Sequence, residues 1–419
     1  MYKVTDLSVK YTVAADVTED SEGVMVVGPY TIVSQLGRGS FGTVHLVKNT
    51  KTGQHYAMKE YAKSGLRKRR QSDMMKGTRG GGPMRPGRGG LFAARQMAMK
   101  QQNEEASDPF SLIKTELAIS KKLKHPNLVR LYEVLNDSEM DVLYLVMDLC
   151  EKGPIQKLDA EQKLSTKFSP EVAHKYFTQA LMGLEYLHEH DIIHRDIKPD
   201  NLLITEDDVL KIADFGESVL LSEDKTNVKG STGTPAFMAP ELCQNAAEVS
   251  GEAADIWSLG ICLYCMVFGT LPFEGASVIQ IMDSIADADL RFPGPYDEDL
   301  SDLLKRMLER NPETRITIDE IREHPWVTQN GEYALPSKEK NCEHHVGEIT
   351  QQDIDDAIRP IFNIMPVISA MAKLRRFRRR IKEKREREQA LLQEQEKQQG
   401  ISSEAIAQSD TAQTPLAEN

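Results

Sequence analysis

Apolar and polar positions divide the chain into a first part with strand patterns and a second part with helical patterns. Short apolar or alternating runs, typical of strands, lie at 30–36, 43–47, 56–59 and 142–147. Longer apolar or amphipathic runs, typical of helices, cover 170–188 and most of the chain up to Trp326. From about Glu332 the globular pattern fades, so the sequence predicts a folded domain at 30–327 that follows an N-terminal arm at 1–29.

Polar residues concentrate in the stretch His194–Asn201 and in Asp214-Phe215-Gly216. Two apolar runs, Asn201–Thr205 and Val209–Ala213, lie between these clusters and are separated by an acidic turn. This pattern predicts a two-stranded ribbon that holds both polar clusters at its ends. Together the clusters supply carboxylates, a carboxamide and a lysine, which are the groups that magnesium-assisted phosphoryl transfer requires.

The run Leu36–Val44 (LGRGSFGTV) contains glycines with GxGxxG spacing. The spacing alone is a weak signal, since dinucleotide-binding folds use it before a helix, whereas a strand pattern follows it here. A glycine-rich hairpin that covers the phosphates of ATP therefore fits, because glycines let backbone amides approach a ligand closely. A flexible hairpin tip is the alternative interpretation.

An ion pair is predicted between Lys59, at the end of the third strand, and Glu116. A helix is expected after Asp108-Pro109, which suit an N-cap and a first turn. The residues that share one face of this helix are Leu112, Glu116, Ile119 and Leu123. A glutamate on such an apolar face needs a partner, and Lys59 would then be aimed at the α- and β-phosphates of ATP. Ile113 and Leu117 form a second apolar face, which leaves two orientations of the helix open.

Residues 64–107 differ in composition from their surroundings, with a basic run at 67–70 and a glycine-, proline- and arginine-rich run at 77–90. Such a segment cannot bury enough apolar surface to fold alone, so a disordered insertion is predicted. It is either a tolerated surface loop or a site that captures an acidic partner or substrate. The net charge of the whole chain is -12, which argues against nucleic acid as a partner.

The 419 residues, 40% of them hydrophobic, allow two or three domains with sizeable cores. No secretory signal is apparent at 1–17, and the longest apolar run, Leu259–Phe268, is too short to span a bilayer and predicts a buried helix. The five cysteines lack framework spacing, as expected for an intracellular protein. Cys262 and Cys265 are interpreted as buried thiols rather than as a zinc or redox site. The predicted location is the cytoplasm, with the nucleus as an additional compartment.

In order and spacing, these motifs resemble those of the eukaryotic protein kinases over Tyr30–Val327, about two thirds of the chain. Further features resemble the calcium/calmodulin-dependent protein kinase kinases: the basic insertion, the string 233–241 (GTPAFMAPE) and the end of the domain from Asn311 to Ser337. The resemblance implies an α+β, two-lobed protein-kinase fold. Its N-lobe would have five strands and one main helix, its C-lobe would be mostly helical, and a C-terminal helical regulatory segment would follow.

The same resemblance implies a serine/threonine protein kinase that uses ATP and Mg²⁺ and phosphorylates activation-loop threonines of downstream protein kinases, of the calmodulin-dependent or the AMP-activated/SNF1 type. The residues with implied catalytic roles are Lys59, Glu116, Asp196, Lys198 and Asn201. Those implied to bind magnesium are Asn201 and Asp214. Those implied to contact the nucleotide are Leu36, Gly37, Gly39, Gly42, Val44, Ala57, Lys59, Met147, Asp148 and Cys150. Asp196 would accept or orient the substrate hydroxyl, and Lys198 would steady the γ-phosphate.

The chain departs from these kinases at two positions. Glu217 stands where the family has a small apolar residue, which leaves the preference between serine and threonine acceptors open. Gly230 stands where many kinases carry an activating phosphothreonine, so Arg195 must be satisfied in another way. Activity without phosphorylation of the activation loop is therefore predicted, with Ser231 and Thr232 as remaining candidate sites.

The segment 328–388 corresponds to the autoinhibitory and calmodulin-binding region of these kinases, and calmodulin is expected to bind at about 354–388. Apolar anchors at 1-5-8-14 spacing in a basic helix are typical of calmodulin targets. These anchors are Ile364, Ile368, Met371 and Phe377. A nuclear-localisation run, a membrane-surface helix and a solvated charge run are competing interpretations. The tail 389–419 is expected to be helical and then disordered.

Two other functions remain open at this point. One is an upstream kinase of SNF1-type kinases that calmodulin does not control. The other is a catalytically inactive scaffold, although such a scaffold would typically lack Lys59, Asp196 or Asp214, and all three are present.

Overall fold

A computed structural model describes most of the chain between residues 9 and 357. The described residues are 9–12, 15–19, 23–39, 42–63, 113–136, 142–158, 164, 166–221, 227–228, 233–243, 249–294, 296–343 and 349–357. All of them belong to one compact unit. Several predicted features lie outside these residues, namely the insertion at 64–107, the N-cap Asp108 with Leu112, the loop 230–232, the anchors from Ile364 to Phe377 and the tail 389–419.

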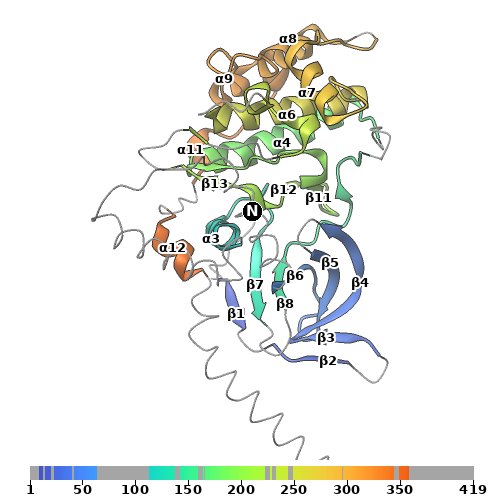
Figure 1. The fold of residues 1–419 in the computed structure, drawn as a ribbon, viewed down its shortest axis with the longest axis vertical. Helices are drawn as coiled ribbons and strands as arrows, with labels where there is room; N and C mark the ends of the chain where they lie inside the picture. The colour runs from blue at the N-terminus through green and yellow to red at the C-terminus, as the bar shows by residue number, and fades with distance from the viewer. Residues whose placement is uncertain are drawn as a thin grey trace, which may run out of the picture. The chain divides into compact units, whose positions relative to one another are not determined.

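The strand-rich part forms an eight-stranded sheet with the order β1-β7-β8-β6-β5-β4-β3-β2 (Figure 1). The strands in its centre are β4 (Tyr30–Gly39), β5 (Gly42–Asn49), β6 (His55–Ala62), β8 (Val142–Met147) and β7 (Leu131–Asn136). Neighbouring strands in this group are antiparallel. They cover the strand patterns of the sequence, and an apolar cluster that includes Val47, Met58 and Val146 packs on one face.

The sheet exceeds the five expected strands, because the segment predicted as an arm adds three short ones. These are β1 (Lys10–Thr12), β2 (Val17–Glu19) and β3 (Met25–Val27). Strands β3 and β2 continue the sheet beyond β4, whereas β1 pairs in parallel with β7 at the opposite edge. Ala15 and Val27 are buried in the apolar cluster. A strand of three residues is too short for its period to be visible in the sequence.

Helix α3 (Lys114–Lys122) carries Glu116. Both apolar faces predicted for this helix are enclosed, since Ile113, Leu117 and Ile119 are fully buried. Glu116 is buried with them, with only 5% of its surface exposed. The carboxylate therefore points into the protein, as the first of the two possible orientations required.

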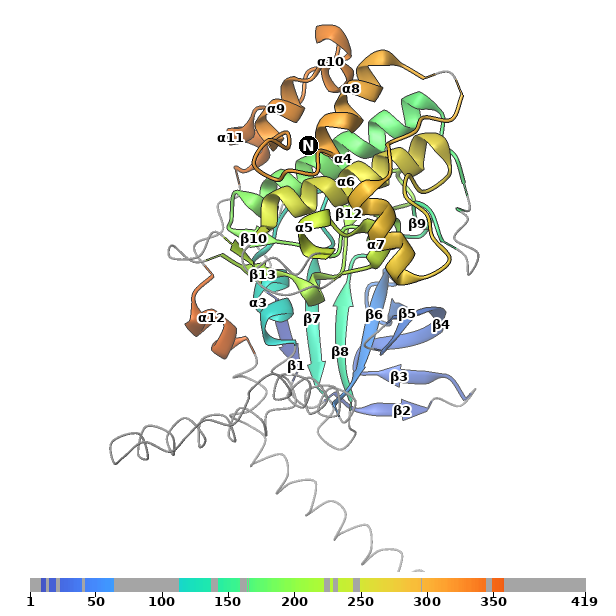
Figure 2. The same ribbon diagram turned by 45° about the horizontal axis from the view of Figure 1, so that its top comes forward.

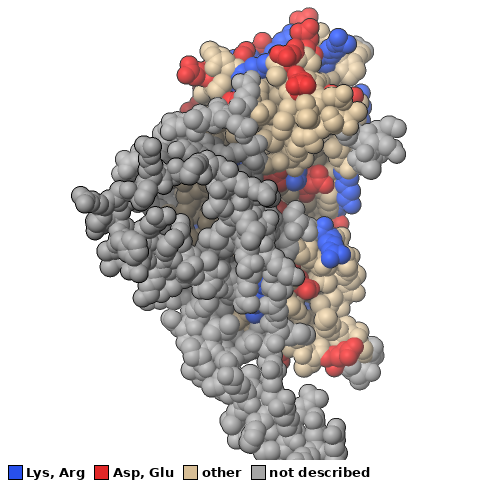
Figure 3. Space-filling model, viewed as in Figure 1, with Lys and Arg blue, Asp and Glu red and all other residues tan. Residues whose placement is uncertain are grey.

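The rest of the described chain is mainly helical, and α4 (Pro170–His188) packs against α6 (Gly251–Phe268) at its centre (Figure 2). The other helices are α5 (Pro240–Cys243), α7 (Val278–Asp287), α8 (Glu298–Met307), α9 (Ile318–Glu323), α10 (Pro325–Thr328), α11 (Lys338–Asn341) and α12 (Gln351–Asp356). Acidic and basic side chains lie side by side at the α8–α9 end (Figure 3). The helix caps follow the sequence, since the hydroxyls of Ser169 and Ser250 accept from the first turns of α4 and α6.

Helix α6 is long and apolar enough to cross a membrane, but 83% of it is buried inside the protein. It is therefore the core helix that the sequence predicted. Cys262 and Cys265 are buried within it, and burial raises the pKa of both thiols. Among the described residues, no group of three or more histidine, cysteine or acidic side chains could hold a metal ion.

Besides the large sheet, the described residues form small sheets of two or three short strands. The three-stranded sheet β12-β11-β9 consists of β12 (Leu210–Ile212), β11 (Leu202–Ile204) and β9 (Gly153–Pro154). The two-stranded sheets are β10 (Ile192–Ile193) with β13 (Val219–Leu220), and β14 (Asn227–Val228) with β15 (Val249–Ser250). Strands β11 and β12 are antiparallel, which confirms the predicted ribbon.

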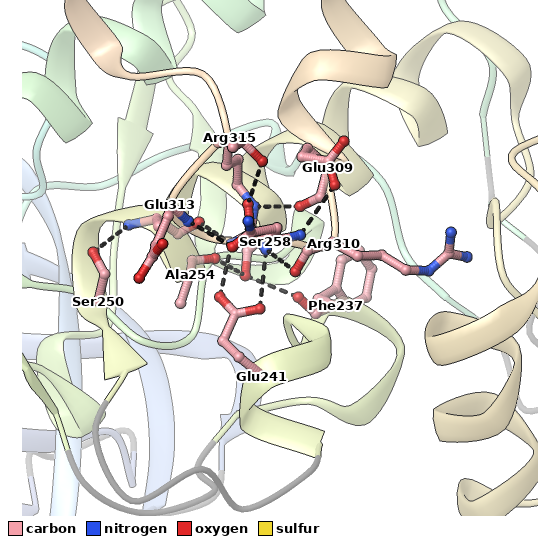
Figure 4. A network of polar contacts seen from close by, with 12 residues as sticks. Phe237, Glu241, Ser250, Ala254, Ser258, Glu309, Arg310, Glu313 and Arg315 are labelled. Atoms are coloured by element: carbon pink, nitrogen blue, oxygen red, sulfur yellow. Dashed lines mark hydrogen bonds and ion pairs between the residues drawn. The ribbon is translucent and has the colours of Figure 1, made fainter.

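A buried ion pair joins Glu241 of α5 to Arg315 (Figure 4). Nη1 and Nη2 of Arg315 are 2.7 Å and 2.9 Å from the two carboxylate oxygens of Glu241. The same guanidinium donates to the backbone carbonyls of Ala253, over 2.7 Å, and Glu309, over 2.8 Å. Arg315 is only 4% exposed, so it is the partner of Glu241 and not the surface arginine that a lone arginine usually is.

Candidate active site

The ribbon β11–β12 brings Asn201 next to Asp214. Leu202 lies opposite Ile212, and one step further the amide of Ala213 donates to the carbonyl of Asn201 over 2.9 Å. Asp214 follows directly and adopts the left-handed backbone conformation, with φ of 65°. This conformation is uncommon outside glycine and is held by the surrounding structure. The two residues predicted to bind magnesium therefore leave the same end of the ribbon.

The carboxylate of Asp196 lies within a cluster of hydrogen-bond donors. Its Oδ2 is 2.6 Å from Nζ of Lys198 and 3.1 Å from Nδ2 of Asn201. The hydroxyl of Thr234 donates to Oδ1 over 3.1 Å and accepts from Lys198 over 2.9 Å. These contacts fix the direction in which the carboxylate points. A group that orients a reacting hydroxyl must be held in this way.

Asp255, near the start of α6, holds the backbone of the same loop. Its carboxylate accepts from the amides of His194 and Arg195, each over 2.8 Å, and lies 3.0 Å from Nε2 of His188. Asp255 is 1% exposed, so these donors replace the hydration that the carboxylate loses on burial. Arg195 has a φ of 68°, and the paired amides hold this unusual conformation.

Lys59 contacts two acidic residues of the site, its predicted partner Glu116 and also Asp214. Its Nζ lies 3.2 Å from Oε1 of Glu116 and 2.9 Å from Oδ1 of Asp214. The hydroxyl of Tyr61 donates to both oxygens of Glu116, over 2.7 Å and 2.9 Å. Burial lowers the pKa of Lys59, but the charges of Glu116, Tyr61 and Asp214 outweigh this effect and raise it well above its usual value. The ammonium is therefore charged, and the predicted ion pair is present.

The ionised carboxylate of Asp214 suits a divalent cation. Burial raises the pKa of Asp214, but the neighbouring positive charge of Lys59 lowers it by more, so the net shift of the pKa is downward. Nδ2 of Asn201 donates to the carbonyl and to Oδ2 of Asp196, which leaves its amide oxygen as the atom for a metal. One carboxylate and one amide oxygen match the hard ligands of Mg²⁺, which completes its coordination with water and substrate phosphates.

The side chains predicted to contact the nucleotide line one face of the central sheet. Val44 lies opposite Lys59, and Ala57 lies opposite Met147. Because opposed residues of antiparallel strands share a face, and because residues two apart do so too, these four side chains point to the same side. Leu36 lies at a bulge of β4 and is 51% exposed, an apolar side chain at the surface of the hairpin.

The glycines of the hairpin are required for different reasons. A Cβ atom at Gly42 would lie 1.6 Å from the carbonyl oxygen of Glu60, so the close approach of β6 excludes a side chain there. A Cβ atom at Gly37 would meet nothing within 4 Å. Gly39 pairs with Gly42 across the hairpin. The lack of a side chain at Gly42 therefore serves packing. Gly37, in contrast, faces open space from which a ligand could approach the backbone.

Asp148, directly after β8, has a structural role. Its amide donates to the carbonyl of Arg130, and its carboxylate accepts from the hydroxyl of Tyr132 over 2.7 Å and from Lys211 over 3.0 Å. These contacts occupy the amide and the carboxylate of Asp148. Its backbone carbonyl is therefore the group that can contact the nucleotide. Burial raises the pKa of the Cys150 thiol to about 12, so this side chain is a neutral neighbour of the site.

Glu217, the departure noted after Asp-Phe-Gly, lies across from Arg195. In the β10–β13 pair Ile193 lies opposite Val219, and the hydroxyl of Ser218 donates to the carbonyl of His194 over 3.4 Å. The next residues on the two segments are Arg195 and Glu217. Burial lowers the pKa of the Arg195 guanidinium, and the negative charges of Glu217 and Asp255 oppose this shift. An acidic side chain is thus placed beside the arginine whose partner was left open.

The sequence did not identify Tyr61, Thr234 and Asp255 as parts of the site. Tyr61 has a local signal, since it lies two residues after Lys59 on a strand and therefore shares its face. Asp255 has a weaker one, as an acidic residue in a mostly apolar helix. Thr234 has none, because its contact with Asp196 depends on a loop whose path the sequence pattern does not show.

Comparisons with known proteins agree with this geometry. The protein kinase domain matches residues 86–327. A calcium/calmodulin-dependent protein kinase kinase of Emericella nidulans is 37% identical over 367 residues, which cover 83% of this chain and 67% of that protein. A probable serine/threonine-protein kinase of Dictyostelium discoideum is 36% identical over 360 residues, covering 85% and 46%. A calcium/calmodulin-dependent protein kinase kinase of Caenorhabditis elegans is 36% identical over 369 residues, covering 85% and 63%. The chain thus spans about half to two thirds of the length of these relatives.

Proposed function

This chain belongs to the protein kinase family, and we propose that it transfers the γ-phosphate of ATP to serine or threonine residues of other proteins. The observation that carries the proposal is the bridge from Lys59 to both Glu116 and Asp214. It joins the sheet, α3 and the end of the ribbon in one arrangement. Phosphoryl transfer depends on such positioning and on charge stabilisation, not on a covalent bond between protein and phosphate.

Each residue of the site has a distinct task in this reaction. The carboxylate of Asp196, held by Thr234 and Lys198, orients the hydroxyl of the substrate and accepts its proton. The ammonium of Lys198 lies beside that carboxylate, where it can neutralise charge on the transferred phosphoryl group. Asn201 and Asp214 would hold Mg²⁺, which neutralises phosphate charge when bound. Lys59, fixed by Glu116, would position the α- and β-phosphates.

The proposed substrates are activation-loop threonines of downstream protein kinases. Support comes from the relatives named calcium/calmodulin-dependent protein kinase kinases. The basic insertion at 64–107 is proposed to capture an acidic surface of the substrate, because it concentrates positive charge in a chain that is acidic overall. A serine/threonine kinase that acts on SNF1-type kinases without calmodulin is the second candidate.

Incubation with ATP-Mg and inactive downstream kinases tests the proposed activity, with an Asp196→Ala variant as the control. The wild-type protein is expected to phosphorylate at least one of these kinases on its activation loop, and the variant is expected not to. Equal and negligible transfer by both proteins to every kinase offered would show that the proposed function is wrong.

Calmodulin is proposed to bind the segment 354–388. The apolar anchors from Ile364 to Phe377 and the surrounding arginines support this, as do the names of two relatives. Titration of a 354–388 peptide with calcium-loaded calmodulin should give saturable binding that EDTA abolishes. A peptide in which Ile368 and Phe377 are replaced by aspartate is the matched control. Absence of binding would favour the calmodulin-independent candidate.

Phosphorylation of the activation loop is not expected to be required for activity. The acidic side chain of Glu217 lies beside Arg195, the residue that a loop phosphate would otherwise neutralise. A Ser231→Ala, Thr232→Ala double variant should therefore keep kcat/KM within about threefold of the wild type, a change of under 1 kcal/mol. A loss of most of the activity would contradict this prediction, provided that circular dichroism shows the variant to be folded.

A further inference from the structure

Helices α11 and α12 come after the helical part of the fold, and each contacts it. Helix α12 lies beside α3 in both ribbon views (Figures 1 and 2), and the two helices are in contact. Nζ of Lys122, in the last turn of α3, lies 2.6 Å from Oδ2 of Asp353 in α12. At the end of α12, Ala357 is fully buried and its carbonyl accepts from the hydroxyl of Tyr11 over 2.9 Å. Strand β1, which contains Tyr11, is itself bound to the sheet edge.

The carboxylate of Asp353 is also held in place by the N-cap residue of its own helix. It accepts from the amide and the hydroxyl of Thr350, each over 2.8 Å, and the amide of Asp353 donates back to that hydroxyl. This reciprocal arrangement is a capping box, which fixes the first turn of α12. The hydrogen bond from Lys122 lowers the pKa of Asp353 to about 2, so the carboxylate is charged at neutral pH.

Asn341 of α11 makes a second attachment to the fold. Its Nδ2 donates to the carbonyl of Met182, over 2.9 Å, and to Oε2 of Glu185, over 2.8 Å, both on α4. Its Oδ1 lies 2.9 Å from Nε2 of His125, in the loop after α3. Nδ1 of His125 accepts from the amide of Asn127, so in the neutral ring Nε2 carries the hydrogen and donates to Asn341. One side chain thus ties α4 to the loop that leaves α3.

We propose that α11 and α12 together form a strap that positions α3, and that Asp353 is a positioning residue for the Lys59–Glu116 pair. Helix α3 has nine residues, with Glu116 in its first turn and Lys122 in its last. At 1.5 Å per residue such a helix is about 13 Å long, so a shift at one end moves the other end directly. The contact of Lys122 with Asp353 therefore bears on the distance between Glu116 and Lys59. This role in the reaction rests on the proposed kinase function, whereas the effect on α3 itself does not.

The test uses the full chain with Asp353→Lys, which places two ammonium groups against each other. The expected result is a fall of about tenfold in kcat/KM, since the substitution both removes the ion pair and adds a repulsion in its place. Adding Lys122→Glu to this variant should restore most of the activity by reversing the ion pair. The loss of the capping box alone would not be rescued in this way, so the restoration separates the two effects of Asp353→Lys.

Glu320→Lys is the matched control. Glu320 also forms a capping box, with Thr317 in α9, and an exposed ion pair with Arg306 over 3.3 Å. This variant should leave kcat/KM unchanged, because the described contacts of Glu320 are with Arg306 and Thr317, which lie outside the site described above. A second readout, the hydrogen-exchange protection of the amides of α3, does not depend on catalysis. Protection should fall in Asp353→Lys, recover with Lys122→Glu and stay unchanged in Glu320→Lys.

Three outcomes decide the matter. Loss and recovery of both α3 protection and activity support the strap. Unchanged α3 protection in Asp353→Lys, or no recovery in the charge-reversed variant, overturns it. If the wild-type chain transfers no phosphate, the proposed function fails, and the protection of α3 still decides whether the strap holds this helix.

Discussion

Replacing Asp196 by asparagine is expected to lower kcat for phosphate transfer by roughly 10²- to 10⁴-fold, the usual contribution of a positioned general base. Asparagine keeps the shape of the side chain but removes the negative charge. It cannot take the proton of the substrate hydroxyl, and it places a neutral group 2.6 Å from the ammonium of Lys198. KM for ATP should change little, because Lys59 and Asp214 keep their mutual contact. Steady-state kinetics with a protein substrate measure both constants.

Asp200→Asn is the matched control for this experiment. Asp200 lies in the same loop and its side chain is exposed, but none of the contacts described in the cluster around Asp196 involves it. Its charge acts on Lys198 and Asp196 without a direct contact, so its removal should leave kcat within about twofold. Comparable losses of kcat in both variants would show that the charge of the loop matters in general and that Asp196 has no special role.

The sequence predicted those parts of the site that local patterns determine. The ribbon was predictable because two apolar runs flank an acidic turn, and its ends then place Asn201 and Asp214 together. The pair of Lys59 and Glu116 was predictable because a glutamate among apolar residues on a helix face requires a partner. In both cases the signal is a period or a burial cost that neighbouring residues reveal.

Other parts were not predictable, since they depend on contacts between distant segments. The contact between Lys122 and Asp353 joins residues 231 positions apart, and neither residue stands out in its own helix. Strands β1 to β3 are three residues long and gain their stability from the sheet edges that they meet. Gly42 belongs to a recognised motif, but the structure gives it a packing role that the motif does not show.

Replacing Arg315 by methionine is expected to lower the free energy of unfolding by about 3–5 kcal/mol, the usual cost of removing one partner of a buried ion pair. The substitution leaves the carboxylate of Glu241 buried with no cation. It also removes the hydrogen bonds to the carbonyls of Ala253 and Glu309, and their loss adds to the cost. Urea unfolding followed by circular dichroism measures the effect.

The double variant Glu241→Leu, Arg315→Met separates the ion pair from the other contacts. Without the carboxylate no charge is left buried, so the double variant should be less destabilised than Arg315→Met alone. It should still be less stable than the wild type, because methionine does not replace the hydrogen bonds from Arg315 to the two carbonyls. Arg306→Met removes an exposed ion pair with Glu320 and should cost at most about 1 kcal/mol. If Arg315→Met were no worse than Arg306→Met, the buried pair would not hold α5 to the end of the domain. Glu241 and Arg315 would then be two satisfied charges with no structural consequence.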